Sequence, residues 1–180
     1  EERAEIIREK GTNRARFFGG QVDKYSWVDV GSSYVMSDVL AAFLYGQLEQ
    51  WESIQAKRKA IWERYDEALG DWAEGRCIGR PIVPNHCEQA HHMYYLLMPS
   101  LEARTAFIEH LAKNSIEAVF HYLPLNKSAY ALQMADSGWR RAECPVTEDV
   151  SDRLVRLPFY TSLMEEKQQR VIDSVLSWTA

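Results

Sequence analysis

Two serines stand directly ahead of an apolar, periodic stretch and could bind a phosphate. Ser32 and Ser33 belong to the tract at residues 31–34, and the periodic stretch begins at Ser37. The free N–H groups at the start of a helix attract anions, and neighbouring hydroxyls supply further donors. The alternative is that these serines only cap the helix, which is the commoner role of serine in this position.

A histidine and a tyrosine adjoin at the end of an apolar run. His121 and Tyr122 close the strand predicted at residues 117–122 and stand just ahead of Pro124. Side chains at the exit of a strand can reach into a cleft, so this pair is a candidate ligand contact. A histidine that simply satisfies its hydrogen bonds at the strand end is the alternative.

A cluster of histidines and one cysteine is the third candidate for chemistry. It comprises His86, Cys87, His91 and His92. Zinc sites usually combine one close pair of ligands with a second close pair downstream, and only isolated histidines and a lone cysteine follow here. We therefore expect no metal site. The sequence also lacks a nucleophile elbow, a P-loop and a dinucleotide-binding glycine motif, so it predicts no self-contained set of catalytic residues.

The elements that would position these residues begin with a long helix. From Ser37 to Leu69, apolar residues recur mostly three or four apart, which predicts one helix of roughly nine turns, on the order of 50 Å long. Ser37 is the expected N-cap and Gly70 the expected stop. Residues 39–48 are apolar on nearly every side, so we expect them to be buried. A helix of this length commonly bridges two domains or lies against a partner.

Shorter elements are predicted on both sides of that helix. Residues 4–10 indicate the end of a helix, and the aromatic stretch at residues 12–33 indicates an irregular segment that covers a site or an interface, or that packs on its own domain. Beyond a boundary near residue 70, the alternation of strands and helices predicts a small α/β unit. We expect strands at residues 93–98, 117–122 and 155–158, helices at residues 101–113, 128–135 and 147–153, and a last helix that a capping box at Ser162 and Glu165 opens and that ends near Ser177.

Composition excludes several classes of protein. A net charge of −5 provides no basic surface for nucleic acid. No stretch approaches the ~18 apolar residues that a membrane span needs. Three cysteines without a paired spacing predict reduced thiols and therefore a cytoplasmic protein. Because the sequence opens without methionine and has no signal peptide, we expect a fragment of a longer cytosolic chain.

Several ordered motifs together resemble the sugar aminotransferases of the DegT/DnrJ/EryC1/StrS family, over essentially all 180 residues. The segments at residues 9–14 and 22–27 most resemble the dTDP-4-amino-4,6-dideoxygalactose transaminase branch of that family. The other motifs are the tract at residues 31–38, the Gln-Leu-Glu triplet at 47–49, the aromatic strand at 92–95, the His-Tyr-x-Pro-Leu segment at 121–125 and the Leu-Pro pair at 157–158.

The resemblance implies the C-terminal part of a fold-type I aminotransferase, a homodimer that uses pyridoxal 5'-phosphate. Residues 1–35 would be the end of the large cofactor-binding domain, residues 36–70 a long linking helix, and residues 71–180 the small C-terminal α/β domain. The family's cofactor lysine would lie upstream, and none of the lysines present sits in a matching motif. We therefore assign no catalytic residue and expect the isolated chain to be inactive.

The resemblance also implies ligand contacts. Ser33 stands where the family usually has an asparagine that reaches the cofactor phosphate of the neighbouring subunit. Serine is shorter than asparagine but still a donor, whereas Val35 cannot replace the basic residue that is frequent at its position. His121 and Tyr122 would face the nucleotide sugar. Lys24, in the aromatic segment, is placed to meet the diphosphate of the substrate, or it is a plain solvated lysine.

The implied reaction of the intact protein is the transfer of an amino group from L-glutamate to C4 of a dTDP-4-keto-6-deoxyhexose, a step in deoxysugar and cell-surface polysaccharide biosynthesis. Two alternatives stay open. One is a sugar-nucleotide dehydratase of the same family, which has a histidine in place of the cofactor lysine. The other is a non-catalytic dimerisation module built on the long helix.

Overall fold

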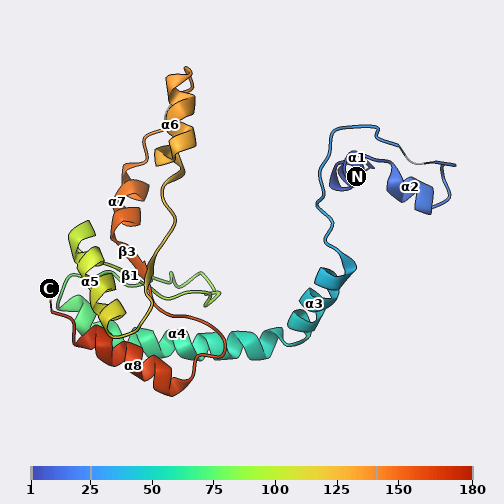
Figure 1. The fold of residues 1–180 in the computed structure, drawn as a ribbon. Coiled ribbons are helices and arrows are strands. Elements are labelled where there is room, and N and C mark those ends of the chain that lie inside the picture. Colours follow the sequence, from blue (N-terminus) through green and yellow to red (C-terminus); the bar gives the residue numbers. More distant parts are fainter. Residues whose placement is uncertain (1, 25, 141, 180) are drawn as a thin grey trace. The chain divides into compact units, whose positions relative to one another are not determined.

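The computed structural model describes residues 2–24, 26–140 and 142–179. The chain divides into two compact units, Glu1–Trp51 and Glu52–Ala180 (Figure 1). Each unit has its own elements, and each is treated separately below.

The first unit is held together by two segments whose backbones pair. Glu9 forms an antiparallel bridge with Ser33, and Thr12 forms another with Trp27. This pairing places the tract that contains Ser33 beside the end of the first helix. The helices of the unit are α1 (Glu2–Arg8), α2 (Arg14–Phe18) and α3 (Asp38–Glu49).

Two glycines allow the paired segments to approach each other. A Cβ atom on Gly31 would lie 2.1 Å from the backbone nitrogen of Gly11, and one on Gly11 would lie 1.9 Å from the carbonyl oxygen of Asp29. Gly11 also has a φ of +78°, in the left-handed region that favours glycine. Neither position therefore tolerates a side chain without a shift of the backbone.

The stretch predicted to be irregular, residues 12–33, contains one short helix. Five residues form α2, and Gly19 follows its last turn. The aromatic rings of Phe17 and Phe18 meet edge to face, with 5.5 Å between their centroids. The prediction of a wholly irregular segment was therefore wrong at α2. Tyr25, one of the aromatic residues of the stretch, lies outside the described residues.

The single long helix predicted from Ser37 to Leu69 is two helices. Helix α3 ends at Glu49 and α4 (Trp51–Glu74) begins two residues later. Between them, Gln50 has φ −107° and ψ 8°, outside the α-helical region, and this backbone rotation interrupts the helix. Apolar residues keep their helical spacing across Gln50, so the sequence pattern did not predict this break.

Helix α4 also runs past Gly70, the predicted stop. A glycine inside a helix costs only about 1 kcal/mol relative to alanine. The last turn of α4 contains Trp72 and Ala73, both buried in the core of the second unit. Burial of these side chains outweighs the cost of the glycine, so tertiary packing decides where the helix ends.

The prediction that residues 39–48 are buried was wrong for the described chain, because α3 has no buried residue. No described segment of the first unit covers it. Phe43, for example, is 70% exposed. The large apolar residues exposed along α3 and just beyond it are Val39, Leu40, Phe43, Leu44, Tyr45, Leu48 and Trp51.

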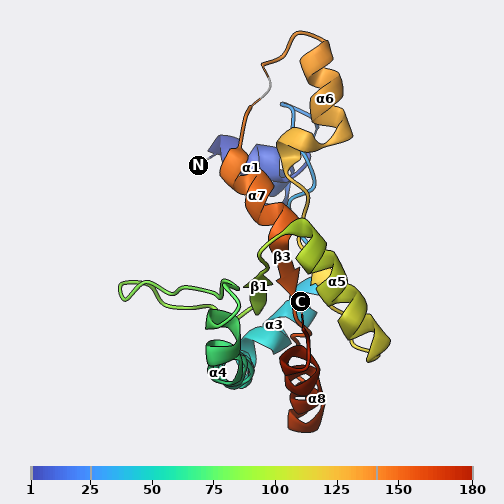
Figure 2. The ribbon, with the colours of Figure 1, turned by 90° about the vertical axis from the view of Figure 1, so that its left-hand side faces the viewer.

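The second unit is built on a small antiparallel sheet of three strands in the order β1-β3-β2. Val155 is the partner of Leu96 on one side and of Phe120 on the other, which makes β3 the central strand. The turned view in Figure 2 shows α7 running directly into β3. The elements after α4 are β1 (Tyr95–Leu97), α5 (Leu101–Lys113), β2 (Val119–Phe120), the 3-10 helix η1 (Leu125–Lys127), α6 (Ala129–Asp136), α7 (Pro145–Arg153), β3 (Leu154–Arg156) and α8 (Glu165–Leu176).

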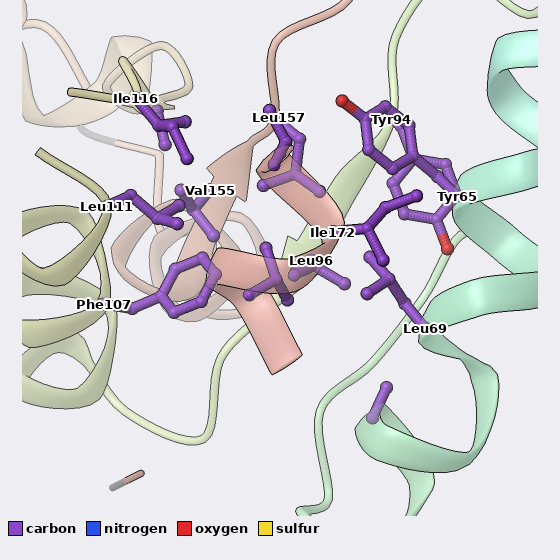
Figure 3. Packing of buried hydrophobic residues seen from close by; sticks show 14 of the residues in the cluster. Tyr65, Leu69, Tyr94, Leu96, Phe107, Leu111, Ile116, Val155, Leu157 and Ile172 are labelled. Carbon is purple, nitrogen blue, oxygen red and sulfur yellow. The ribbon is translucent and has the colours of Figure 1, made fainter. Parts of the chain in front are cut away.

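The core of the second unit lies where α4, α5, α8 and the sheet converge (Figure 3). Its members come from segments far apart in the sequence, and burial of their apolar surface is the main stabilising contribution to the unit. The side chains labelled in Figure 3 are Tyr65 and Leu69 from α4, Tyr94 and Leu96 at β1, Phe107 and Leu111 from α5, Ile116, Val155, Leu157, and Ile172 from α8.

The last helix begins without the predicted capping box. Its N-cap is Met164, no side chain caps it, and Glu165 is its first residue. The helix is fixed instead by a long-range contact, because the buried Gln168 donates to the carbonyl oxygen of Ile61 at 2.7 Å. This hydrogen bond joins α8 to α4 across more than one hundred residues of sequence.

Candidate functional site

A hollow of about 610 Å³ in the first unit contains Ser33 in its wall. It lies between the end of α1, the start of α2 and the segment that leads into α3. Its lining mixes cations, carboxylates, hydroxyls and two large aromatic rings. The lining residues are Arg8, Glu9, Lys10, Thr12, Arg14, Phe18, Trp27, Ser33, Val35, Met36, Ser37 and Asp38.

Ser33 and Ser37 have different roles in this wall. The Ser37 Oγ accepts a hydrogen bond from the backbone N–H of Leu40 at 3.4 Å and so caps α3, as predicted. Ser33 is exposed, and no residue in the described ranges forms a hydrogen bond with its hydroxyl. The capping role therefore belongs to Ser37, and the Ser33 hydroxyl remains able to donate to a ligand.

Lys24, the predicted contact for a diphosphate, is exposed. It is absent from the described lining of the hollow, whereas Lys10 is part of it. Neither Lys10 nor Arg14 was predicted as a site residue, and both line the hollow. The available signal was their position in the segment at residues 9–14, which supported the family resemblance but carried no predicted role.

The second candidate site is in the other unit, where His121 follows β2 directly. The His121 side chain is half-buried, and its Nδ1 is buried without a hydrogen-bond partner among the described residues. Burial lowers the pKa of His121, and the positive charges of Arg156 and His92 lower it further. The lowered pKa favours the neutral form of the imidazole at pH 7.

Tyr122 lies next to this histidine on the surface. Its ring is 4.9 Å from that of His121, centroid to centroid, at an angle of 59°. The side chain is 80% exposed, while the backbone carbonyl accepts a hydrogen bond from the Ser151 hydroxyl at 3.0 Å. The pair thus combines a fixed backbone with a phenol that is free to contact a ligand.

Two arginines that were not predicted as site residues flank Phe120, the residue before His121. Arg156 donates to the carbonyl oxygen of Phe120 at 3.4 Å, and the Arg104 guanidinium lies 5.9 Å from the centre of the Phe120 ring. The Nε atoms of both arginines are buried without a partner among the described residues. A charged residue inside the predicted strand at residues 155–158 was the signal for Arg156.

The predicted site residues belong to separate units. Ser33 and Lys24 are in the first unit, and His121 and Tyr122 are in the second. Within the described ranges, no three histidine, cysteine, aspartate or glutamate side chains are grouped so that they could hold a metal ion. None of the described helices combines the length and the apolar character that crossing a bilayer requires.

Comparison with known proteins identifies the family. The model of the DegT/DnrJ/EryC1/StrS aminotransferase family matches residues 1–176. The chain belongs to this family. The resemblance predicted from the motifs is thereby confirmed, and the DegT/DnrJ/EryC1/StrS aminotransferases are pyridoxal-phosphate-dependent enzymes.

Three curated relatives illustrate the range of proteins that the chain resembles. An uncharacterized protein, MJ1066 of Methanocaldococcus jannaschii, is 28% identical over 97% of the chain and 45% of its own length. The dTDP-3-amino-3,6-dideoxy-alpha-D-galactopyranose transaminase of Aneurinibacillus thermoaerophilus is 24% identical over 97% of the chain and 42% of its length. The putative pyridoxal phosphate-dependent aminotransferase EpsN of Bacillus subtilis is 26% identical over 93% and 43%. The chain therefore spans less than half the length of these relatives.

A solved structure of a putative sugar aminotransferase has the same fold over the matched residues. The putative sugar aminotransferase Spr1654 from Streptococcus pneumoniae, in its apo form, superposes with a TM-score of 0.78 at 25% identity, over 96% of this chain and 41% of that one. Spr1654 has also been solved in forms that contain pyridoxal and pyridoxamine phosphate. The likeness confirms the predicted fold class, the C-terminal part of a fold-type I aminotransferase.

Proposed function

We propose that the intact protein transfers an amino group from L-glutamate to C4 of a dTDP-4-keto-6-deoxyhexose. The observation that carries the proposal is the family match across residues 1–176. Two curated relatives with names that specify dTDP-amino-sugar transaminases support a nucleotide-sugar substrate. The resemblance of residues 9–14 and 22–27 to the 4-amino branch supports position C4.

The hollow around Ser33 fits the phosphate of the cofactor. A phosphate ester is a dianion at neutral pH and binds to hydroxyl donors and cations, and the wall offers the free Ser33 hydroxyl with cations beside it. Bound pyridoxal phosphate supplies the electron sink that lets an amino group pass from one substrate to another. Ser33 would hold that phosphate for the neighbouring subunit, and we place the amine that anchors the cofactor outside residues 1–180.

The nucleotide sugar is proposed to lie against the second unit at the end of β2. A neutral His121 can accept a hydrogen bond from a sugar hydroxyl, because its pKa is lowered by burial and by Arg156. Tyr122 would add an exposed phenol as donor and stacking surface. Lys24 remains the proposed contact for the diphosphate.

In the intact protein, residues 1–180 are proposed to contribute to three parts. Residues 1–35 would be the end of the large domain, residues 36–70 the linking region and residues 71–180 the small domain. The exposed apolar side chains of α3 support a homodimer, since a helix that is apolar on every side is normally covered. Three free cysteines support a cytoplasmic location.

The reaction is tested on the intact protein with pyridoxal phosphate, L-glutamate and a dTDP-4-keto-6-deoxyhexose. We expect 2-oxoglutarate and an amino sugar in equal amounts, measured by mass spectrometry, and no turnover by the isolated chain of 180 residues. Loss of water from the sugar without incorporation of nitrogen would replace the proposal with the dehydratase alternative. Turnover by the isolated chain would contradict the placement of the anchoring amine.

A further inference from the structure

We infer that two side chains of α7, Glu148 and Ser151, are positioning residues that hold the segment at residues 121–127 in its ligand-binding conformation. The inference rests on the proposed function, because this segment carries His121 and Tyr122, the proposed contacts of the nucleotide sugar. Glu148 and Ser151 act through the backbone and side chains that they bind, and not by touching the ligand.

Burial of apolar side chains does little to hold this region of the second unit. Pro124 is buried, but no described residue from Leu125 to Arg153 is. Leu125 is 86% exposed and Trp139 is 69% exposed. Helix α6 lies beyond α7, away from the sheet (Figure 1). A region with so little buried apolar surface opens easily unless polar contacts fix it.

Glu148 binds donors from both sides of α6. Its Oε1 accepts a hydrogen bond from the Asn126 amide at 2.7 Å, and a longer one from the backbone N–H of Cys144 at 3.5 Å. Its Oε2 lies 3.0 Å from the Lys127 ammonium nitrogen. The hydrogen bonds from Lys127 and Asn126 lower the pKa of the Glu148 carboxyl, so the group is ionised at neutral pH.

The Asn126 amide joins the two ends of the excursion that contains α6. Its Nδ2 also donates to the carbonyl oxygen of Ala142 at 3.1 Å. An amide has two N–H donors, and both are therefore bound within the protein. The Asn126 donors thus serve the fold and are not offered to a ligand.

Ser151 holds the other end of the segment. Its hydroxyl donates to the carbonyl oxygen of Tyr122 at 3.0 Å. Ser151 follows Glu148 by three residues, so both side chains lie on one face of α7. This helix is tied to the sheet, because it runs directly into β3 and the Arg153 Nη1 donates to the carbonyl oxygen of Met98 at 3.2 Å. A helix fixed to the core therefore holds the segment at both ends, and we call these contacts of Glu148 and Ser151 the α7 clamp.

Loss of the α7 clamp is expected to weaken binding even though every ligand contact is still present. A released segment occupies several conformations, and the apparent dissociation constant rises as the binding-competent fraction falls. One intramolecular hydrogen bond changes such a fraction by up to about tenfold. We therefore expect Glu148→Ala to weaken binding about tenfold and Ser151→Ala about threefold.

Hydrogen exchange, followed by mass spectrometry on the intact protein, tests the α7 clamp without a substrate. Glu148→Ala and Ser151→Ala should speed the exchange of backbone N–H groups in residues 122–128 and leave β1 unchanged. Asp149→Ala is the matched control, since it removes a carboxylate of the same helix that binds Arg153 at 3.0 Å instead of the segment. Ser151→Thr keeps the hydroxyl and should exchange like the wild type. Unchanged exchange in both alanine variants of the clamp would overturn the inference.

The positioning role is tested by calorimetric titration of dTDP-glucose, which has no keto group to aminate, into the cofactor-loaded intact protein. The losses stated above are expected for the clamp variants, with no loss for Asp149→Ala or Ser151→Thr. Affinity for pyridoxal phosphate should stay unchanged in all variants, whereas a general loss of structure would lower it too.

The two measurements separate this inference from the proposed function. Faster exchange with an unchanged affinity for dTDP-glucose would show that the α7 clamp is structural only, and would end the positioning role. A wild type that binds no dTDP-glucose would contradict the nucleotide-sugar substrate of the proposed function, and the exchange rates would still decide whether α7 holds the segment.

Discussion

The half-buried imidazole of His121 makes stability depend on pH. Its folded-state pKa lies below the usual value of about 6.5, because burial, Arg156 and His92 disfavour the charged form. The folded state therefore binds fewer protons than the unfolded state in this range. The stabilising contribution is fully present above pH 6.5 and is lost as the pH falls towards the folded-state pKa.

We expect His121→Gln to reduce the drop in unfolding temperature between pH 7.5 and pH 5.5. Calorimetric scans of wild type and variant measure the effect. His86→Gln is the control, because His86 is exposed in a loop. Identical pH profiles for His121→Gln and wild type would show that this histidine is not desolvated in the folded protein.

The Tyr65 hydroxyl forms a single hydrogen bond whose contribution to stability can be measured by mutation. The Tyr65 side chain is fully buried, and its hydroxyl donates to the carbonyl oxygen of Pro158 at 3.0 Å. Tyr65→Phe removes the donor and leaves the carbonyl without its partner, so we expect a loss of about 1–2 kcal/mol in the free energy of unfolding. Urea denaturation measures it, and Tyr45→Phe, an exposed position, should change stability little. Equal effects of the two variants would contradict the assignment.

At the scale of elements, the close approach of two backbone segments positions Ser33, the proposed phosphate donor. Gly31→Ala would bring a Cβ within 2.1 Å of the Gly11 nitrogen, and neither backbone can yield without moving the other. We expect weaker binding of pyridoxal phosphate, because Ser33 follows Gly31 closely and would shift with it. Fluorescence titration of the intact protein measures the affinity.

The matched control for Gly31→Ala is Gly70→Ala. Gly70 lies inside α4 of the second unit, and a Cβ built on it would make only ordinary contact with the Arg80 side chain, 3.7 Å from its Nη2. Alanine there should stabilise the helix by about 0.5–1 kcal/mol and leave the affinity unchanged. Equal affinities of Gly31→Ala and Gly70→Ala would show that the paired segments do not position the phosphate site.

At the scale of the whole molecule, the apolar side chains exposed on α3 are the proposed dimer interface. Leu48 is 57% exposed. Asp38 and Glu49, at the two ends of α3, are the helix's charged residues, so the surface around Leu48 is uncharged. Leu48→Asp places a charge on this surface, and we expect it to lower the mass of the intact protein in solution from dimer to monomer. Light scattering during size-exclusion chromatography measures the mass.

The control for Leu48→Asp introduces the same charge elsewhere. Ile82 is 88% exposed in a loop of the second unit, and Ile82→Asp should leave the mass unchanged. A dimer that persists in Leu48→Asp would exclude α3 from the interface. A dimer of the isolated chain that Leu48→Asp dissociates would instead support a dimerisation module built on this helix.

Local sequence patterns determined the elements whose ends are encoded by neighbouring residues. Helix α5 was predicted at its observed bounds, because Ser100 caps it and its periodicity is regular. The ordered motifs also identified the family, since they depend only on residue order. The cap at Ser37 was predicted for the same reason and is observed.

Tertiary structure alone decided the features that depend on distant residues. The end of α4 is set by burial of Trp72 and Ala73, and the position of α8 by the bond from Gln168 to Ile61. The proximity of Arg156 to His121 likewise results from strand pairing. Propensity and periodicity describe a residue and its neighbours along the chain, whereas burial, hydrogen bonding and charge depend on residues that only folding brings together.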